Sequence, residues 1–271
     1  MSETQASATN CFGDNTEYDF AHIVSQLDRY LRLRTIPIGM KRYKTVAELE
    51  AVPRIRRPDP SEKFATDQIV GQSRWMGWTL GITMDNLMGD QCGAVVGLHP
   101  RDEKWLSGDR MNGVWYGTIE DASAHQHAMS CAPYGEYEAL AVSPLTSGRL
   151  GVPDICLIYG TPGQMITFMN GLQYTGYKKY SFSCVGESAC ADSWGNALAT
   201  GEPSLSIPCY AERKFGGVQD DEMLIALPPK FLPQVVEGLA ALSKNGLRYP
   251  IVGHGITKSP LDSIEASYGA S

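Results

Sequence analysis

Apolar residues recur at helical spacing in two stretches near the two ends of the chain. In residues 17–31 the apolar positions are Phe20, Ile23, Val24, Leu27 and Leu31. In residues 229–244 they are Phe231, Val235, Leu239 and Leu242. A spacing of three to four residues is typical of an amphipathic helix with one buried face. We therefore predict a helix in each stretch.

Between these helices, short apolar or alternating runs predict strands. The runs are 36–41, 93–98, 137–142, 153–159, 180–185 and 223–227. The run 153–159 is apolar without alternation, which is typical of a strand buried on both faces, whereas 180–185 alternates. Further helices are expected over 61–76, 118–131 and 163–172. Together the patterns predict an α/β or α+β fold with a mixed sheet and flanking helices.

The same patterns predict one folded unit with a tail at each end. Residues 1–14 and 259–271 are expected to be flexible tails, and 15–258 a single domain. A weak echo between the first and second parts of the chain is compatible with two related halves, 15–130 and 131–258. A chance match explains the echo equally well.

Composition narrows the class of protein. The chain has 271 residues, of which 43% are hydrophobic and 20% charged, so it can bury a full-sized core. Its net charge of −7 argues against nucleic acid and anionic membranes as partners. No membrane span or signal peptide is evident. Seven cysteines, an odd number, indicate reduced thiols and a cytoplasmic location. The sequence is compatible with a homo-oligomer.

No catalytic signature motif stands out. A nucleophile elbow, a phosphate-binding loop, a GxGxxG turn, a zinc-protease HExxH and paired CxxC motifs are all missing from the sequence. We therefore expect no cofactor and no metal.

Several short segments carry a family resemblance. They are Pro37 to Lys41, Cys92 with Gly97-Leu98, Pro144-Leu145, Pro153-Asp154, Pro162 with Gln164, and Pro208-Cys209 to Arg213. In this order, over about residues 25–250, the chain resembles the DUF169 family, whose members are largely uncharacterised. The resemblance implies little about function, although cysteine-rich relatives invite a metal or iron–sulfur interpretation.

Two charged residues and a tyrosine are candidates for catalysis, and an arginine is a candidate for substrate binding. Lys41 ends an apolar strand, where partial desolvation can release its proton near neutral pH. Glu187 lies in a glycine-containing loop and could act as a general base, and Arg213 could hold an anionic group. Tyr116 or Tyr177 could donate a phenolic proton. The alternatives are a lysine at the sheet edge and a solvated loop carboxylate.

The thirteen tyrosines suggest a pocket for a flat organic molecule, since tyrosine offers an apolar wall with a polar tip. We assign substrate binding to Trp78, Tyr116 and Gln164, together with Arg213. The leading hypothesis is an enzyme of small-molecule catabolism, a lyase or hydrolase acting on an aromatic or carbonyl substrate. Ordinary core and surface packing explains most of the aromatic residues equally well.

Two rival hypotheses belong to other classes. The first is a protein that binds a metal, an iron–sulfur cluster or a tetrapyrrole through four thiols, those of Cys92, Cys184, Cys190 and Cys209. Their spacing is irregular, and buried cysteines usually pack as small apolar groups. His125 and His127 lie about 200° apart on the predicted helix and cannot chelate together. The second rival is a ligand-binding module without turnover.

Overall fold

The computed structural model describes residues 18–89, 91–251 and 267–269. Most of the predicted tails, 1–14 and 259–271, lies outside these residues. The helices are α1 (Phe20–Leu31), α2 (Val46–Glu50), α3 (Thr66–Met76), α4 (Gln91–Val95), α5 (Glu103–Leu106), α6 (Ile119–Ala128), α7 (Pro162–Gln173), α8 (Asn196–Thr200), α9 (Tyr210–Gly216) and α10 (Leu232–Lys244). The strands are β1 (Ile38–Tyr43), β2 (Leu80–Thr83), β3 (Ala139–Pro144), β4 (Ile155–Gly160), β5 (Ser204–Ser206) and β6 (Met223–Leu227).

The named strands form one sheet in the order β2-β3-β1-β4-β6-β5. Every pairing in it is antiparallel. The fold is therefore α+β, and the sheet is antiparallel where a mixed one was predicted. β4 lies between β1 and β6, and all its residues are buried, as its unbroken apolar run predicts.

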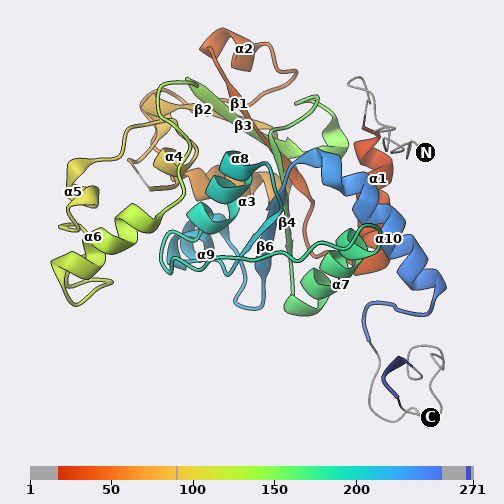
Figure 1. Cartoon of the computed structure of the whole chain (residues 1–271). Coiled ribbons are helices and arrows are strands. Elements are labelled where there is room, and N and C mark those ends of the chain that lie inside the picture. Colours follow the sequence, from red (N-terminus) through yellow and green to blue (C-terminus); the bar gives the residue numbers. More distant parts are fainter. Residues whose placement is uncertain (1–17, 90, 252–266, 270–271) are drawn as a thin grey trace, which may run out of the picture.

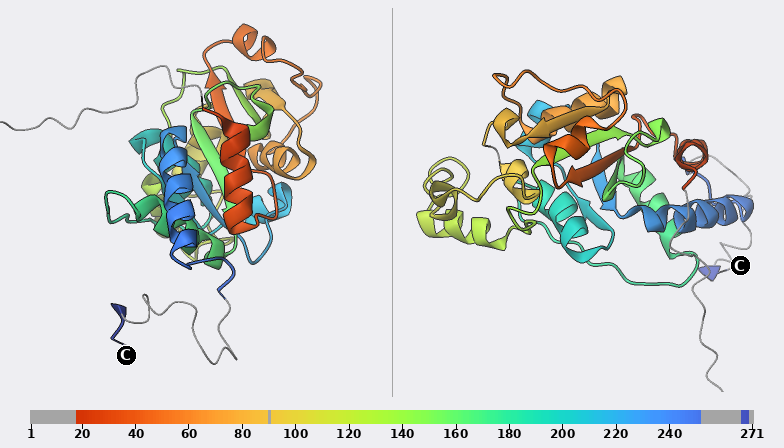
Figure 2. Two further views of the ribbon diagram at one scale, coloured as in Figure 1. Left: turned by 90° about the vertical axis from the view of Figure 1, so that its right-hand side faces the viewer. Right: turned by 90° about the horizontal axis from the view of Figure 1, so that it is seen from above.

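Helices cover the sheet on both faces, and strand alternation separates two cores (Figures 1 and 2). Ile38, Met40 and Leu157 belong to a core shared with α3, α4 and α8. Their strand neighbours Cys156 and Ile158 belong to the core shared with α1, α7 and α10. A smaller cluster around Tyr43 and Leu49 joins β1 and β3 to α2.

The first helix shows how the sequence dictates these layers. All five apolar residues predicted to share a face of α1 are buried. The side chain of Asp19 accepts a hydrogen bond from the backbone N–H of His22 at 2.9 Å and caps the helix. Of the face predicted for α10, Val235 and Leu239 belong to the same core, Leu242 is also buried, and Phe231 precedes the helix and is partly buried. Both long amphipathic helices are thus confirmed.

Two predicted strands are wrong. Residues 93–95 belong to helix α4, and residues 96–98 form the turn that follows it. Their apolar side chains pack in the core next to the sheet, and the segment pairs with no strand. Residues 180–185 form no ladder and are mostly exposed. The short strands β2 and β5 escaped prediction because three or four residues carry too little periodicity.

The strand order is symmetric about the β1–β4 junction. From the centre outward, the strands on one side are β1, β3 and β2, and those on the other side are β4, β6 and β5. The first, third and second strands of each half of the chain therefore take equivalent places. This correspondence concerns strand order alone. It would divide the chain into two halves near residue 150, between β3 and β4. The predicted halves, 15–130 and 131–258, are not confirmed.

Among the residues that the structure describes, none of the helices combines the length and apolar character needed to cross a bilayer.

The approach of α3 to α9 depends on two glycines. A Cβ added at Gly71 would overlap the carbonyl group of Gly216. We expect Gly71→Ala to lower the free energy of unfolding by about 1–3 kcal/mol, because the helices must separate. Urea denaturation measures the change. Gly117→Ala is the matched control, since an added Cβ there meets nothing within 4 Å. Equal stability of both variants would contradict the close contact.

Candidate functional site

A pocket of about 160 Å³ opens on the α3 side of the sheet. Its walls come from α3, α4, α5, the turn after α5, the loop before α8, and α9. The lining residues are Ala65, Asp67, Gln91, Cys92, Trp105, Met111, Trp115, Glu187, Ser188, Cys209, Ala211 and Phe215. In Figure 1 the segment carrying α5 extends from the body of the molecule beside α4. The pocket thus combines large apolar walls with a few carboxyl and thiol groups.

Asp67 is the most deeply buried carboxylate that lines the pocket, with 2% of its surface exposed. It lies in the first turn of α3, where the helix dipole favours a negative charge. The Cys92 thiol donates toward Asp67, with Sγ 3.5 Å from Oδ2 and 3.7 Å from Oδ1. Behind it, the sulfurs of Cys92 and Cys190 are 2.7 Å apart. A carboxylate and two thiols therefore meet at one point.

A second carboxyl, that of Glu212, is buried beside the pocket. Its Oε2 accepts a hydrogen bond from the Cys209 backbone N–H at 2.9 Å, while Oε1 has no hydrogen-bond partner. Burial raises the pKa of Glu212 to about 7. Burial, followed by the charge of Glu212, also raises the pKa of the Cys209 thiol. Glu212 is thus a group that can exchange a proton near neutral pH.

Arg74 supplies a buried positive charge to this region. Its Nη2 donates to both carboxylate oxygens of Glu222 at 2.7 Å, and Nε donates to Thr35 Oγ1 at 3.1 Å. The guanidinium lies 3.9 Å from the centre of the Tyr159 ring. Burial raises the pKa of the Tyr159 phenol well above its usual value. These contacts fix α3, and Asp67 with it, against the sheet.

A hydrogen-bond network orients the loop at the pocket mouth. Ser188 Oγ donates to Gln91 Oε1 at 2.6 Å, and Gln126 Nε2 donates to the same oxygen at 3.1 Å. His125 Nε2 donates to the Glu187 carbonyl at 2.7 Å. Ser188 has a left-handed backbone, with φ at 63°, which these bonds hold in place. His125 is therefore a buried, satisfied histidine.

One of the predicted site residues, Glu187, lines the pocket, and a second, Tyr116, lies near Glu187 without lining the pocket. Glu187 Oε2 accepts a hydrogen bond from the Tyr210 backbone N–H at 3.3 Å. Tyr116 packs its ring 5.0 Å from that of His125. Burial, then the nearby Glu187, raises the pKa of the Tyr116 phenol. The structure therefore brings Glu187 and Tyr116 together.

Lys41 and Arg213 do not join them. Lys41 follows Met40 in β1, so alternation turns it to the sheet face away from the pocket, where Nζ donates to the Leu150 carbonyl at 2.8 Å. Arg213 is exposed and pairs with Asp220 at 3.1 Å. The predicted cluster of Lys41, Glu187 and Arg213 is thus not assembled.

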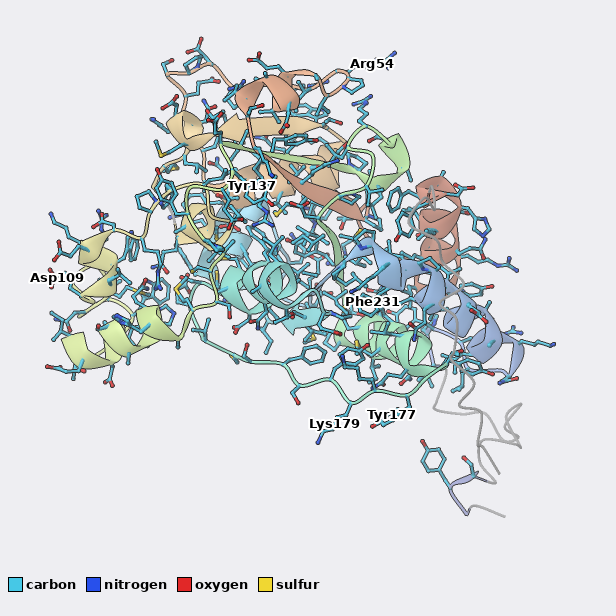
Figure 3. All side chains as sticks on the ribbon, turned by 45° about the horizontal axis from the view of Figure 1, so that its top comes forward. Arg54, Asp109, Tyr137, Tyr177, Lys179 and Phe231 are labelled. Carbon is cyan, nitrogen blue, oxygen red and sulfur yellow. The ribbon has the colours of Figure 1, made fainter. Side chains whose placement is uncertain are left out.

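The other predicted residues have separate surroundings. Tyr177 is 76% exposed, and Figure 3 shows it on the outer edge of the molecule. Gln164 caps α7 through the Thr161 backbone N–H and donates to the carbonyls of Leu31 and Arg32, which is a structural role. Trp78 is half-buried, with the Arg56 guanidinium 4.3 Å from its ring centre.

The cysteines only partly follow the predicted metal set. Cys92, Cys190 and Cys209 converge on the pocket, whereas Cys184 is exposed. Within the described ranges, no group of three or more His, Cys, Asp or Glu side chains is placed to hold a metal ion. The six cysteines of those ranges are thiols.

Removing Arg74 should leave Glu222 buried without its counter-charge. We expect Arg74→Met to lower the free energy of unfolding by about 3–5 kcal/mol. Adding Glu222→Gln should restore most of the loss, because the stranded charge is removed. Urea denaturation of the wild type, the two single variants and the double variant measures the coupling. Arg34→Met, which breaks an exposed pair with Asp221, serves as control and should change little. If the losses of unfolding free energy in the two single variants simply added up in the double variant, Arg74 and Glu222 would not be paired.

Glu212 should make stability depend on pH. Its pKa is raised from 4.5 to about 7, so between these values the folded protein holds a proton that the unfolded chain has released. The free energy of unfolding should therefore fall, by on the order of 3 kcal/mol, as pH rises from about 4.5 through 7. Glu212→Gln keeps an acceptor for the Cys209 N–H and should lose this fall. Thermal melts across this pH range test it, and parallel profiles would contradict the assignment.

Comparison with known proteins gives a family and no activity. Residues 26–238 match the model of the DUF169 family, which is described as uncharacterised ArCR. The uncharacterized protein MJ0308 of Methanocaldococcus jannaschii is 26% identical over 130 residues, covering 46% of this chain and 55% of that protein. The chain thus spans about half the length of this curated relative. No solved structure matches significantly. The family match covers well over half of the sequence, and the chain belongs to the DUF169 family.

Proposed function

We propose that the protein is an enzyme that converts a small aromatic or carbonyl compound by acid–base catalysis in the pocket above Asp67. The observation that carries the proposal is a carboxylate, 2% exposed, facing a pocket walled by aromatic residues. Buried charges are costly, and a site that retains one beside a cavity is a candidate for chemistry.

The dimensions and walls of the pocket support a one-ring substrate. A cavity of about 150 Å³ is large enough for benzene, and this one has about 160 Å³. Trp105, Trp115 and Phe215 offer flat apolar surfaces to a ring. The Gln91 amide nitrogen can donate to a substrate carbonyl, and Ser188 Oγ, whose proton goes to Gln91 Oε1, can accept from a substrate hydroxyl. The pocket therefore suits a flat molecule with one polar edge.

Two carboxylates can divide the proton transfers. Asp67, at the floor, can accept a proton from the substrate or from a water molecule. Glu187, on the loop before α8, is half-buried and, in its protonated form, can give a proton to the leaving group. Removal of a proton next to a carbonyl leads to lyase chemistry, and removal from water leads to hydrolysis. A lyase and a hydrolase are thus both compatible with the pair of carboxyl groups. The enzyme acts in the cytoplasm, where its thiols stay reduced.

The test begins with a binding screen. One-ring phenols, aromatic acids, aldehydes and ketones are added singly, and the fluorescence of Trp105 and Trp115 together with the melting temperature reports binding. NMR then follows the bound compounds for turnover. Trp115→Ala should weaken binding, because it removes one wall. Compounds that bind without any turnover would instead indicate a ligand-binding module.

Asp67→Asn should lower turnover by about 10²–10⁴-fold while binding persists, because the proton acceptor is lost and the shape is kept. Asp109→Asn is the matched control. Asp109 is an exposed aspartate at the far end of the α5 segment (Figure 3), and its change should leave turnover intact. Turnover of wild-type rate in Asp67→Asn would exclude this mechanism.

A further inference from the structure

The thiols of Cys92 and Cys190 form a pair that acid–base catalysis does not require. Cys92 lies in α4, and Cys190 immediately precedes the π-helical turn Ala191–Gly195. Their sulfurs are 2.7 Å apart although 98 positions separate them in the chain. Both side chains are buried, with 4% and 0% of their surfaces exposed. The fold therefore brings two distant thiols into direct contact.

The two thiols differ in access. Cys92 lines the pocket, whereas Cys190 lies behind it and donates to the Ser188 carbonyl at 3.7 Å. A small molecule that enters the pocket therefore meets Cys92 first. The Asp67 carboxylate, 3.5 Å from the Cys92 sulfur, is placed to take the thiol proton. This arrangement distinguishes an attacking thiol from a resolving thiol.

The pair is close to the geometry of a bond. A disulfide has an S–S length of about 2.05 Å, so the sulfurs need to approach by roughly 0.7 Å. A pocket of about 160 Å³ is too small for a peptide disulfide such as oxidised glutathione. It admits hydrogen peroxide or a small organic hydroperoxide. The geometry favours oxidation by a peroxide over exchange with a bulky disulfide.

We propose that Cys92 and Cys190 are a two-electron redox pair whose oxidant is a small hydroperoxide. The Cys92 sulfur gives its proton to Asp67 and attacks the terminal peroxide oxygen. The O–O bond breaks, the leaving oxygen takes up a proton as water or an alcohol, and Cys92 becomes a sulfenic acid. The Cys190 sulfur then attacks the Cys92 sulfur, and water leaves as the disulfide forms. In total, two thiols and one hydroperoxide give one disulfide, one water and one alcohol or second water.

Of the other described cysteines, Cys131, Cys156 and Cys184 do not line the pocket, and Cys209 does. Cys156 is fully buried in β4, on the opposite face of the sheet. Cys184 is exposed. Cys209 lines the same pocket, and burial and the neighbouring Glu212 raise the pKa of its thiol. Cys209 is therefore the competitor against which the pair must be tested.

The experiment uses the reduced full-length protein with a small excess of hydrogen peroxide. We expect two of the seven thiols to disappear, peptide mapping to show a Cys92–Cys190 cross-link, and dithiothreitol to reverse both changes. Because the cross-link closes a long loop, the melting temperature should rise by roughly 10 °C. These readouts do not involve turnover, so they succeed or fail separately from the proposed acid–base function.

Variants assign the two roles. Cys190→Ser should lose the cross-link and accumulate Cys92 sulfenic acid, which dimedone traps. Cys92→Ser should lose both products. Cys184→Ser, the matched control at an exposed thiol, should still form the cross-link. If a serine variant does not fold, the cross-link map of the wild-type protein decides alone.

Several results would overturn the proposal. They are a Cys92–Cys209 cross-link, cross-links through Cys184 alone, and thiols that all survive the peroxide. Iron or zinc that copurifies in near-stoichiometric amount and is lost in Cys92→Ser would also overturn it, because the thiols would then be metal ligands.

Discussion

The arrangement of the site depends on one buried cation, Arg74. An unpaired guanidinium in a protein interior is very costly, and here two hydrogen bonds to Glu222 and the face of Tyr159 offset that cost. Asp67 precedes Arg74 by seven residues, about two helical turns, so both lie on the same side of α3. The pairing that fixes Arg74 against β4 and the start of β6 therefore also fixes the carboxylate that faces the pocket. Gly71, between them, allows α9 to approach and bring Cys209 to the same place.

Burial, and after it the charge of Glu187, raises the pKa of Glu212, and the charge of Arg74 acts in the opposite direction. Asp67, Glu212 and Glu222 are all buried near Arg74, and Arg74 is already engaged with Glu222. A further negative charge on Glu212 would be poorly compensated, since one of its oxygens has no hydrogen-bond partner. A proton on Glu212 removes this uncompensated charge, and with a pKa of about 7 the group releases that proton near neutral pH. The same region thus gains a proton carrier close to the Cys209 thiol.

Sequence patterns predicted the layers better than the site. Long periodic segments such as α1 and α10 were predictable, because their buried faces follow from spacing alone. The run 93–98 was misassigned, since a fully buried helix and a fully buried strand look alike over six residues. Lys41 was placed in the pocket because its strand was recognised, but the sheet face it occupies depends on register and on neighbours distant in sequence. Asp67 and Glu212 gave only a weak signal, that of acidic residues in the first turn of a helix.

The two chemistries proposed for the pocket converge on the same atoms. In the reduced protein, the Cys92 thiol donates toward Asp67, and this contact orients the carboxylate at the pocket floor. Forming the Cys92–Cys190 disulfide removes the thiol proton and with it that donor. Asp67 would then face the pocket with one stabilising hydrogen bond fewer, which alters its ability to take a proton from a substrate. Oxidation of the pair and acid–base catalysis are therefore coupled through the contact between the Cys92 thiol and the Asp67 carboxylate, both of which line the pocket.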